Sequence, residues 1–502
     1  MRKVITILLL IAVIAITFAS CGKTKAGEVS FDASDILTSS FDGLGVEWGT
    51  YEDTNKMIKG SWSRVLTAVD RLNPSLVRCM TNLDWFVVDF DDKGTESTED
   101  DTWNYNFNNK QMVNASEILD YCQANGIKVA FGVWNVIGNV DPDKDIYGMI
   151  PNSTADPRWA KMNADLMEYL IKVKGYTCIR WFVNTNEPNV IGRKGSSKNA
   201  YGSFDKWAEG MNYVRKAFDD VGLKDLSLVG GDATRYIETE KTFMVNAAKN
   251  LSGILDNYGV HVYANYSELA KGQFQTYFEG LVDNIKDEDS ALGKSKNIYI
   301  WESGLLWGKN TDTDCNEYIT DYAYGLCMAD YTVQAILGGA NGIVYWDLDD
   351  AMHYMYSEEG NTAKEWGMFS TLATADSDMQ EYRPWYHSSV LLTNLLRPGY
   401  TVYGKYTGYE SVRAMATVSP DRKRGGYVVV NNSKETVKEK MILTDKIDGG
   451  DKLYVYYYNE KMLKLGTDGF VVPNYVIDGT LNTELNLEIP GNTLVVVSNE
   501  RI

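Results

Sequence analysis

The chain has 502 residues, of which 44% are hydrophobic and 12% aromatic, and it carries a net charge of −19 at pH 7. This composition is typical of a folded globular protein, and the length exceeds what one ordinary hydrophobic core fills, so we expect two domains, one of them large. The acidic balance argues against nucleic acid and an anionic membrane surface as partners, and weakly against strongly anionic polysaccharides.

The N-terminus has the pattern of a targeting signal and is set apart from the fold. Arg2 and Lys3 precede an apolar run over 4–19, and the small residues Ala19 and Ser20 then lead into Cys21. The pattern resembles a bacterial lipoprotein signal, which implies cleavage before Cys21 and lipid on its sulfur. The alternative is an ordinary signal peptide followed by a coincidental cysteine. We predict a signal peptide over 1–20, a tether over 21–40 and anchorage in the bacterial cell envelope, on the periplasmic side of a membrane or at the cell surface.

Between residues 41 and 349, apolar runs with strand character alternate with stretches of helical spacing. Polar clusters fall at the C-terminal ends of these runs. Strict alternation predicts a parallel sheet, and eight units over roughly 310 residues fit a closed barrel better than an open doubly wound sheet. We therefore predict an α/β fold, a (β/α)8 TIM barrel over 41–390. The expected strands are 41–48, 75–79, 127–135, 181–189, 226–234, 255–263, 297–304 and 342–349; the expected helices are 61–72, 114–125, 156–174, 205–220, 242–250, 274–286 and 318–337.

The pattern changes near residue 400 to short alternating runs separated by turns that carry Gly, Asn and Asp. This is typical of an antiparallel β-sandwich, which we predict for 391–502. Residues 29–40 are candidates to add a strand to it, because they precede the barrel and have no helix of their own. The expected sandwich strands are 400–406, 411–418, 426–431, 437–443, 452–458, 470–476, 481–489 and 492–498.

Two of the barrel strands deliver a glutamate to the C-terminal end. Trp181–Asn189 reads WFVNTNEPN and carries Glu187, and Ile298–Gly304 reads IYIWESG and carries Glu302. Loops at this end of a barrel carry the chemistry. Glycosidic bond cleavage requires two such carboxyls, one kept protonated to donate to the leaving oxygen and one ionised to attack the anomeric carbon. We predict that Glu187 and Glu302 are this pair; the alternative for each is a surface salt bridge.

On these motifs the chain resembles the retaining glycoside hydrolases of clan A, which have glutamates at the ends of strands four and seven. The resemblance covers roughly residues 41–390, and it implies that Glu187 is the acid/base and Glu302 the nucleophile. It also implies four supporting residues. Asn186 would bind the sugar 2-hydroxyl, Tyr263 would donate to Glu302, Arg78 would lie near the nucleophile and Trp346 would form the floor of the cleaved-sugar subsite.

Several further residues are candidates for sugar contacts because they fall at strand ends or in loops that face the barrel mouth. For each of them, core packing is the competing interpretation. A Ser–His–Asp arrangement using the histidine is set aside because the chain has no GxSxG motif. The candidates are His261, Trp134, Asn135 and Trp307, together with Glu47, Trp48 and Asp232.

Other features limit the chemistry. Five cysteines besides Cys21 form no CxxC pair, and the three histidines lack ligand spacing, so no zinc site is expected. A disulfide between Cys315 and Cys327 is left open. No metal or organic cofactor is predicted, because two carboxylates supply the proton and the nucleophile. We expect no calcium site in the acidic loop 89–103, which should simply be solvated.

The sequence therefore predicts a lipid-anchored retaining β-glycosidase whose partner is a carbohydrate. The barrel with its sandwich is similar to the glucosylceramidase, xylanase and β-xylosidase families. Two alternatives stay open: a glycan-binding lipoprotein on a barrel that has lost catalysis, and a transglycosylase that passes the same covalent intermediate to a sugar. No nucleic acid is expected, and the membrane is expected only through the lipid anchor.

Overall fold

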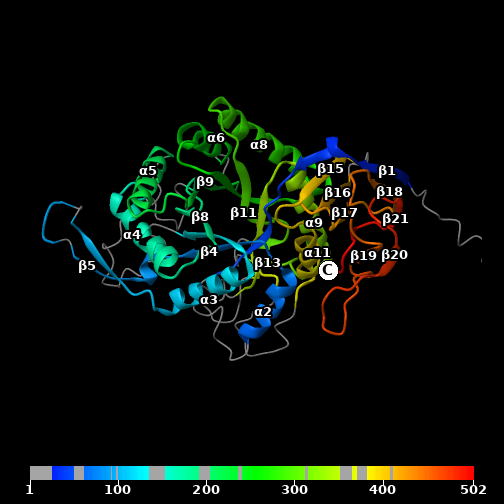
Figure 1. Ribbon diagram of the computed structural model, residues 1–502, viewed down its shortest axis with the longest axis horizontal. Coiled ribbons are helices and arrows are strands. Elements are labelled where there is room, and N and C mark those ends of the chain that lie inside the picture. Colours follow the sequence, from blue (N-terminus) through cyan, green and yellow to red (C-terminus); the bar gives the residue numbers. More distant parts are fainter. Residues whose placement is uncertain are drawn as a thin grey trace, which may run out of the picture.

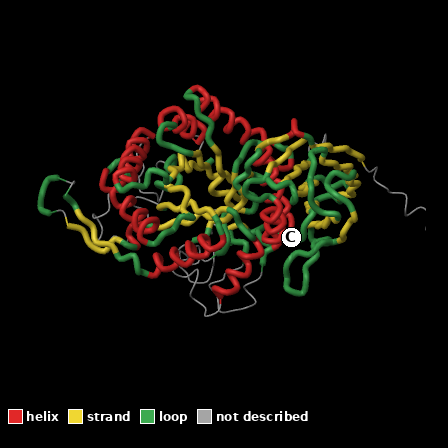
Figure 2. Tube along the Cα trace, viewed as in Figure 1, coloured by secondary structure: helices red, strands yellow, loops and turns green. Residues whose placement is uncertain are grey.

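The computed structural model gives the arrangement of the helices and strands (Figures 1 and 2). Structural statements below concern the residues that it describes, which are 25–49, 61–91, 93–97, 100–134, 153–190, 204–235, 240–310, 315–350, 365–369, 382–406 and 411–502.

Eight parallel strands form a closed barrel and follow one another around it in chain order, with the last strand pairing with the first. Figure 2 shows the strands at the centre and the helices around them. The predicted (β/α)8 barrel is confirmed. The strands are β3 (Gly43–Glu47), β4 (Leu76–Thr81), β7 (Lys128–Val133), β8 (Ile179–Val183), β9 (Ser227–Thr234), β10 (Asn257–Ala264), β11 (Asn297–Leu305) and β14 (Gly342–Tyr345).

Helices connect these strands on the outside of the barrel. α3 is typical: Asn109 caps its first turn by accepting from the Met112 N–H at 2.8 Å, and Gly126 ends it in the left-handed conformation expected of a C-terminal glycine. The helices are α2 (Ser61–Leu72), α3 (Lys110–Asn125), α4 (Pro157–Glu168) with the π-helical turn η3 (Tyr169–Val173), α5 (Phe204–Asp220), α6 (Glu240–Leu251), α7 (Tyr266–Ala270), α8 (Gln273–Ala291), α9 (Tyr322–Leu337) and α11 (Pro384–Leu395).

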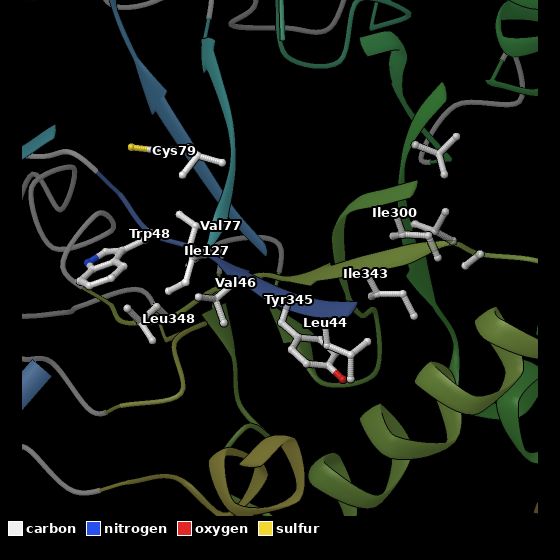
Figure 3. Close-up of a cluster of buried hydrophobic side chains, with 14 of the residues drawn as sticks. Leu44, Val46, Trp48, Val77, Cys79, Ile127, Ile300, Ile343, Tyr345 and Leu348 are labelled. Atoms are coloured by element: carbon white, nitrogen blue, oxygen red, sulfur yellow. The ribbon is translucent and has the colours of Figure 1, made fainter. Parts of the chain in front are cut away.

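Strand alternation divides the barrel residues between two environments. On β4, Val77 and Cys79 pack outward toward the helices, whereas Arg78 and its even-numbered neighbours point inward. Figure 3 shows part of the outer core, where Val46, Val77 and Ile127 lie close together. The inward side of the barrel is filled mainly by large aromatic and aliphatic side chains, among them Trp181 and Trp301. Polar side chains therefore reach the barrel interior mainly near the C-terminal strand ends.

The C-terminal residues form two facing sheets beside the barrel, as predicted. A seven-stranded sheet has the order β2-β15-β16-β17-β22-β19-β20 and a three-stranded sheet the order β1-β18-β21. Their facing sides share one apolar core, and the other side of the large sheet packs against α9 and α11. The strands are β15 (Thr401–Tyr406), β16 (Val412–Val418), β17 (Gly425–Asn431), β18 (Val437–Leu443), β19 (Lys452–Tyr458), β20 (Tyr475–Asp478), β21 (Leu485–Ile489) and β22 (Thr493–Ser498).

Residues ahead of the barrel contribute two strands, one to each sheet. β1 (Lys25–Phe31) pairs with β18, and β2 (Ile36–Thr38) pairs with β15. The strands of 391–502 pair antiparallel with one another, as predicted, whereas the added strand β1 pairs with β18 in parallel. A parallel pairing arises here because the partner strands are joined through the whole barrel and need no tight turn.

Three local expectations are wrong. The acidic segment 89–103, expected as a plain loop, carries two paired strands, β5 (Val87–Asp91) and β6 (Thr102–Tyr105). The aromatic rings of Phe90 and Trp103 stabilise this pair, with their centres 5.3 Å apart. The fourth barrel strand ends at Val183, not near Asn189. The strand expected over 470–476 is the later β20. Short β12 (Lys309–Asn310) and β13 (Cys315–Asn316) were not expected.

Two further observations bear on the sequence analysis. Cys327 is a free, buried thiol, as are Cys79, Cys122 and Cys178, so the disulfide left open for Cys327 is not formed. Within the described ranges, every helix is too short or too polar to cross a bilayer. The signal at 1–20 and Cys21 lie outside the described residues.

Candidate active site

Polar side chains from six barrel strands or their C-terminal ends meet at one end of the barrel. They are Glu47 from β3, Arg78 from β4, Asn186 and Glu187 from the turn after β8, Asp232 from β9, His261 and Tyr263 from β10, and Glu302 from β11. The predicted glutamates are brought together with Arg78, Asn186, His261 and Tyr263.

Arg78 is the cation around which the cluster is built. Its side chain is fully buried, and Nη1 lies 3.0 Å from Glu47 Oε2 and 3.6 Å from Glu302 Oε2. Nη2 donates to Asn186 Oδ1 at 2.7 Å and to Asp232 Oδ2 at 3.0 Å. One planar guanidinium thus fixes residues from four other elements, because its N–H groups have fixed directions. Arg78 therefore sets the position of Asn186 and contributes positive charge beside Glu302.

His261 joins the two catalytic candidates. Its Nδ1 lies 3.2 Å from Glu187 Oε1 and 3.3 Å from Glu302 Oε2, while Nε2 lies 2.9 Å from Asp232 Oδ1. On the far side of Glu302, the Tyr263 hydroxyl donates to Oε1. One nitrogen of His261 is therefore shared by both glutamates, and the other is held by a buried carboxylate.

The backbone that carries Glu187 is held in an unusual conformation. Glu187 has φ 48° and Asp232 has φ 50°, the left-handed region that side chains other than glycine rarely adopt. The Glu187 N–H donates to the Asp232 carbonyl at 3.1 Å, and Asn189 exchanges two hydrogen bonds of 2.9 Å with the Thr234 backbone. These bonds lock the turn to β9 and direct Glu187 toward His261.

The pKa values of the groups around the two glutamates differ from their usual values, because these groups are buried beside one another's charges. Burial raises the pKa of Glu47 to about 8, although Arg78 opposes this. Burial alone would lower the pKa of His261, but the carboxylates of Asp232 and Glu302 raise it to about 10. The positive charges of His261 and Arg78 in turn hold the pKa of Asp232 below its usual value, although burial alone would raise it. At neutral pH the cluster therefore contains two cations and an ionised Asp232, with Glu47 mostly protonated.

The two catalytic candidates are shifted in opposite directions. Burial raises the pKa of Glu302, and the adjacent Glu187 carboxylate adds to this, against the effects of His261, Arg78 and Tyr263. The pKa of Glu187 is lowered, since the hydrogen bond and charge of His261 outweigh its desolvation. Without a sugar, a proton on this pair is thus favoured on Glu302. His261 Nδ1 lies within 3.3 Å of an oxygen of each carboxylate, so the imidazole ring separates the two glutamates.

Aromatic side chains adjoin this cluster. The rings of Trp134 and Trp346 meet edge to face at 5.9 Å, and the guanidinium of Arg78 lies 5.2 Å from the Trp134 ring centre. Trp366, which the sequence analysis did not single out, contacts Tyr263 edge to face at 5.8 Å. Trp366 lies in a stretch without regular structure, so no periodicity could have indicated it.

Asn135 is outside the described residues. Trp307 lies in a separate aromatic cluster with Tyr266 and Tyr318, described below. Glu47 and Asp232, also suggested as sugar contacts, lie within the cluster as buried partners of Arg78. Their role was not readable from the sequence, because it depends on which strands become neighbours in the barrel.

One group of described residues could supply a metal with three ligands. The donor atoms of Glu187, His261 and Glu302 lie within 4.8 Å of one another. The guanidinium of Arg78, 3.6 Å from Glu302, opposes a second cation there. The raised pKa of His261 also keeps a proton on the ring, whereas a metal ligand must be the neutral imidazole. At neutral pH the side chains of Glu187, His261 and Glu302 are therefore better suited to binding protons than to binding a metal ion.

No protein-family model and no curated protein sequence matches the chain. Solved structures do. A glycoside hydrolase family 30 subfamily 8 xylanase from Clostridium acetobutylicum is 10% identical, with 94% of this chain and 99% of that chain covered and a TM-score of 0.60. A GH39 β-xylosidase from Caulobacter crescentus is 15% identical, with coverage of 95% and 100% and a TM-score of 0.59. The family 51 α-L-arabinofuranosidase AbfB from Bifidobacterium longum is 13% identical, with coverage of 94% and 99% and a TM-score of 0.62.

These similar structures are glycoside hydrolases of clan A, and they match over nearly their whole length. The resemblance drawn from the sequence is therefore confirmed at the level of the fold. The chain has the barrel-and-sandwich fold of these hydrolases, with a buried carboxylate cluster at the C-terminal end of the barrel.

Proposed function

We propose that the protein is a retaining β-glycosidase in which Glu187 is the acid/base and Glu302 the nucleophile. The observation that carries the proposal is the proximity of the two carboxylates. An oxygen of each lies within 4.8 Å of an oxygen of the other. Retaining enzymes hold their carboxyl groups about 5–5.5 Å apart, whereas inverting enzymes need about 6.5–9.5 Å to admit a water.

The surroundings of Glu302 suit a nucleophile. Tyr263 donates to Oε1, and Arg78 lies on the side of Oε2, so both partners stabilise the carboxylate over the acid. When a sugar enters, loss of water near the pair strengthens these interactions. We infer that the proton favoured on Glu302 in the empty site then passes to Glu187. Glu302 would attack the anomeric carbon while Glu187 protonates the leaving oxygen.

In the second half of the cycle the roles reverse. Glu187, now ionised, would take a proton from water, and the resulting hydroxide would break the bond between Glu302 and the sugar with overall retention. Asn186, held by Arg78 at 2.7 Å, would bind the sugar beside the reacting carbon, and Trp346 would pack against its ring. The intact carboxylate cluster argues against a barrel that has lost catalysis, and no observation favours a sugar over water as acceptor.

The similar xylanase, β-xylosidase and α-L-arabinofuranosidase structures suggest where a substrate search should begin. We would measure turnover of aryl β-xylosides, β-glucosides and β-galactosides, aryl α-L-arabinofuranosides, and polysaccharides made of these sugars. Glu302→Ala should abolish turnover, and azide should restore it on an activated aryl glycoside with inversion of the product. Glu187→Ala should instead accumulate the glycosyl-enzyme, and azide should restore turnover with retention. If both variants keep native rates on every substrate that the native protein cleaves, the assignment fails.

We further propose that the protein is lipid-anchored through Cys21 in the bacterial cell envelope. The basic and apolar residues ahead of Cys21 support this. Metabolic labelling with a fatty-acid analogue should mark the native chain and not Cys21→Ser. Equal labelling of both would refute the anchor.

A further inference from the structure

A cavity lies where the barrel meets the large sheet. It has a volume of about 530 Å³. On the barrel side it is lined by Tyr266 at the start of α7, Trp307 after β11, and Tyr322 at the start of α9. On the other side it is lined by residues of three neighbouring turns: Asn432 after β17, Asn459–Lys461 after β19, and Gly491–Asn492 before β22.

The lining combines aromatic rings with polar groups. Trp307 is stacked against Tyr318 at 4.7 Å and tilted against Tyr266 at 5.2 Å. Tyr266 is still 42% exposed, so part of its ring remains open to solvent. A rigid, half-exposed tyrosine offers a large amphipathic contact surface at a small entropic cost.

Some of the polar groups at the cavity are available for a ligand. Within the part of the chain that the structure describes, the side chains of Glu460, Lys461 and Asn492 carry no recorded hydrogen bond or ion pair. Asn459, by contrast, donates to Thr493 Oγ1 at 2.7 Å and is already used in its own turn. The free set holds one positive charge, one negative charge and one amide. A neutral ligand rich in hydroxyl groups, with apolar C–H faces, matches this set better than an ion of either sign.

The position of the cavity relates it to the active site. Tyr266 follows Tyr263 by three residues and lies just after β10, and Trp307 follows Glu302 by five residues and lies just after β11, so both residues leave the barrel at the end that carries the two glutamates. Five residues span at most about 18 Å of extended chain. A polymer in the catalytic site therefore needs only a few more sugar units to reach the cavity.

We propose that this cavity is a second binding site for a neutral polysaccharide, which holds the polymer beside the catalytic glutamates. The ligand class rests on the proposed glycosidase function, and the site itself rests on the cavity and its lining. Attachment at two places raises the effective concentration of the polymer at the active site without new contacts there. Short substrates gain nothing from it.

The test measures binding and turnover separately. Binding of arabinoxylan, linear arabinan and mixed-linkage β-glucan is measured by affinity electrophoresis and calorimetry in the Glu302→Ala background, which prevents cleavage. Adding Tyr266→Ala or Lys461→Ala should weaken binding of at least one polymer by about fivefold or more, an effect near 1 kcal/mol. Tyr318→Ala is the matched control, because it removes an equally exposed tyrosine from the same cluster without lining the cavity. It should leave affinity within about twofold.

With Glu302 intact, Tyr266→Ala should leave turnover of aryl glycosides within about twofold and raise KM only on the polymer. The proposal is overturned if no polymer binds, or if Tyr266→Ala and Lys461→Ala bind as tightly as the parent. Failure of the proposed function has a different outcome. Polymer binding that depends on Tyr266, without turnover of any substrate, would retain the second site and remove the glycosidase.

Discussion

Glu47 and Asp232 offer a matched test of the charge in the buried cluster proposed as the active site. Both are buried carboxyl groups that lie 3.0 Å from Arg78. They differ in protonation, because burial raises the pKa of Glu47 to about 8, whereas His261 and Arg78 lower that of Asp232 against its burial. Neutral isosteres should therefore affect the two sites very differently at pH 6.5.

Asp232→Asn removes the anion that pairs with both Arg78 and His261 and leaves two buried cations undercompensated. Breaking a buried ion pair in this way costs roughly 3–5 kcal/mol. Glu47→Gln replaces an acid that is already mostly neutral, so the expected loss is at most that of one hydrogen bond, about 1 kcal/mol. We expect kcat/KM on an aryl glycoside to fall about 100-fold for Asp232→Asn, corresponding to about 2.7 kcal/mol of the barrier, and less than about fivefold for Glu47→Gln.

The pH dependence adds a second check. The pKa of Glu47 is higher folded than unfolded, so the stability it contributes is present below pH 4.5 and is lost as pH rises toward 8. The glutamine of Glu47→Gln carries no ionisable proton, so the variant does not lose stability in this way. Relative to the native protein, the variant should gain stability as pH rises from about 5 to 8, by at most about 1.4 kcal/mol per pH unit in urea unfolding. Equal losses of activity in both variants, or a flat stability difference across this range, would refute the protonation states assigned here.

Two further perturbations follow from the structure. Glu439 on β18 faces the sandwich core opposite Gly27, neither oxygen has a recorded partner among the described residues, and burial raises its pKa to about 7. The free energy of unfolding that protonated Glu439 contributes is thus lost as pH rises from about 4.5 through 7. Glu439→Gln should remove up to about 3 kcal/mol of this decline in the free energy of unfolding. An equal decline in the native protein and the variant would contradict this prediction. EDTA should leave turnover unchanged, whereas Zn²⁺ should inhibit more at pH 8 than at pH 6, since His261 must lose a proton to bind it; loss of activity on chelation would instead indicate a resident metal.

The sequence predicted the barrel because its evidence is local and repeated. Each strand is a buried apolar run, and each helix has its own spacing and caps, as at Asn109 and Gly126. The two glutamates were found for the same reason, since each closes an apolar run. The end of β8 was misplaced because Pro188, which cannot donate to a sheet ladder, was taken as the stop, whereas the strand ends at Val183 where the apolar run gives way to polar residues.

The partners within the site could not be predicted in the same way. Arg78 contacts Glu47 on the neighbouring strand β3, but it also contacts Asp232 on β9, 154 residues further along the chain, and the second contact forms only when the barrel closes. The left-handed backbone of Glu187 is likewise imposed by its bond to the Asp232 carbonyl. For Trp307, the sequence indicated correctly that the residue follows the seventh barrel strand. It did not indicate that Trp307 lines the cavity beside the large sheet rather than the carboxylate cluster.

The place of β1 in the small sheet has a consequence for orientation. β1 is paired with β18 from Lys25 onward, only four residues after Cys21. Four residues reach at most about 14 Å. With lipid on Cys21, the edge of the small sheet would lie at the membrane surface. The short linker would then restrict how far the folded domains can move away from the membrane. In Figure 1 the barrel lies on the far side of the sheets from the start of β1, so the size of the sandwich, rather than a flexible tether, would set how far the barrel stands from the lipid.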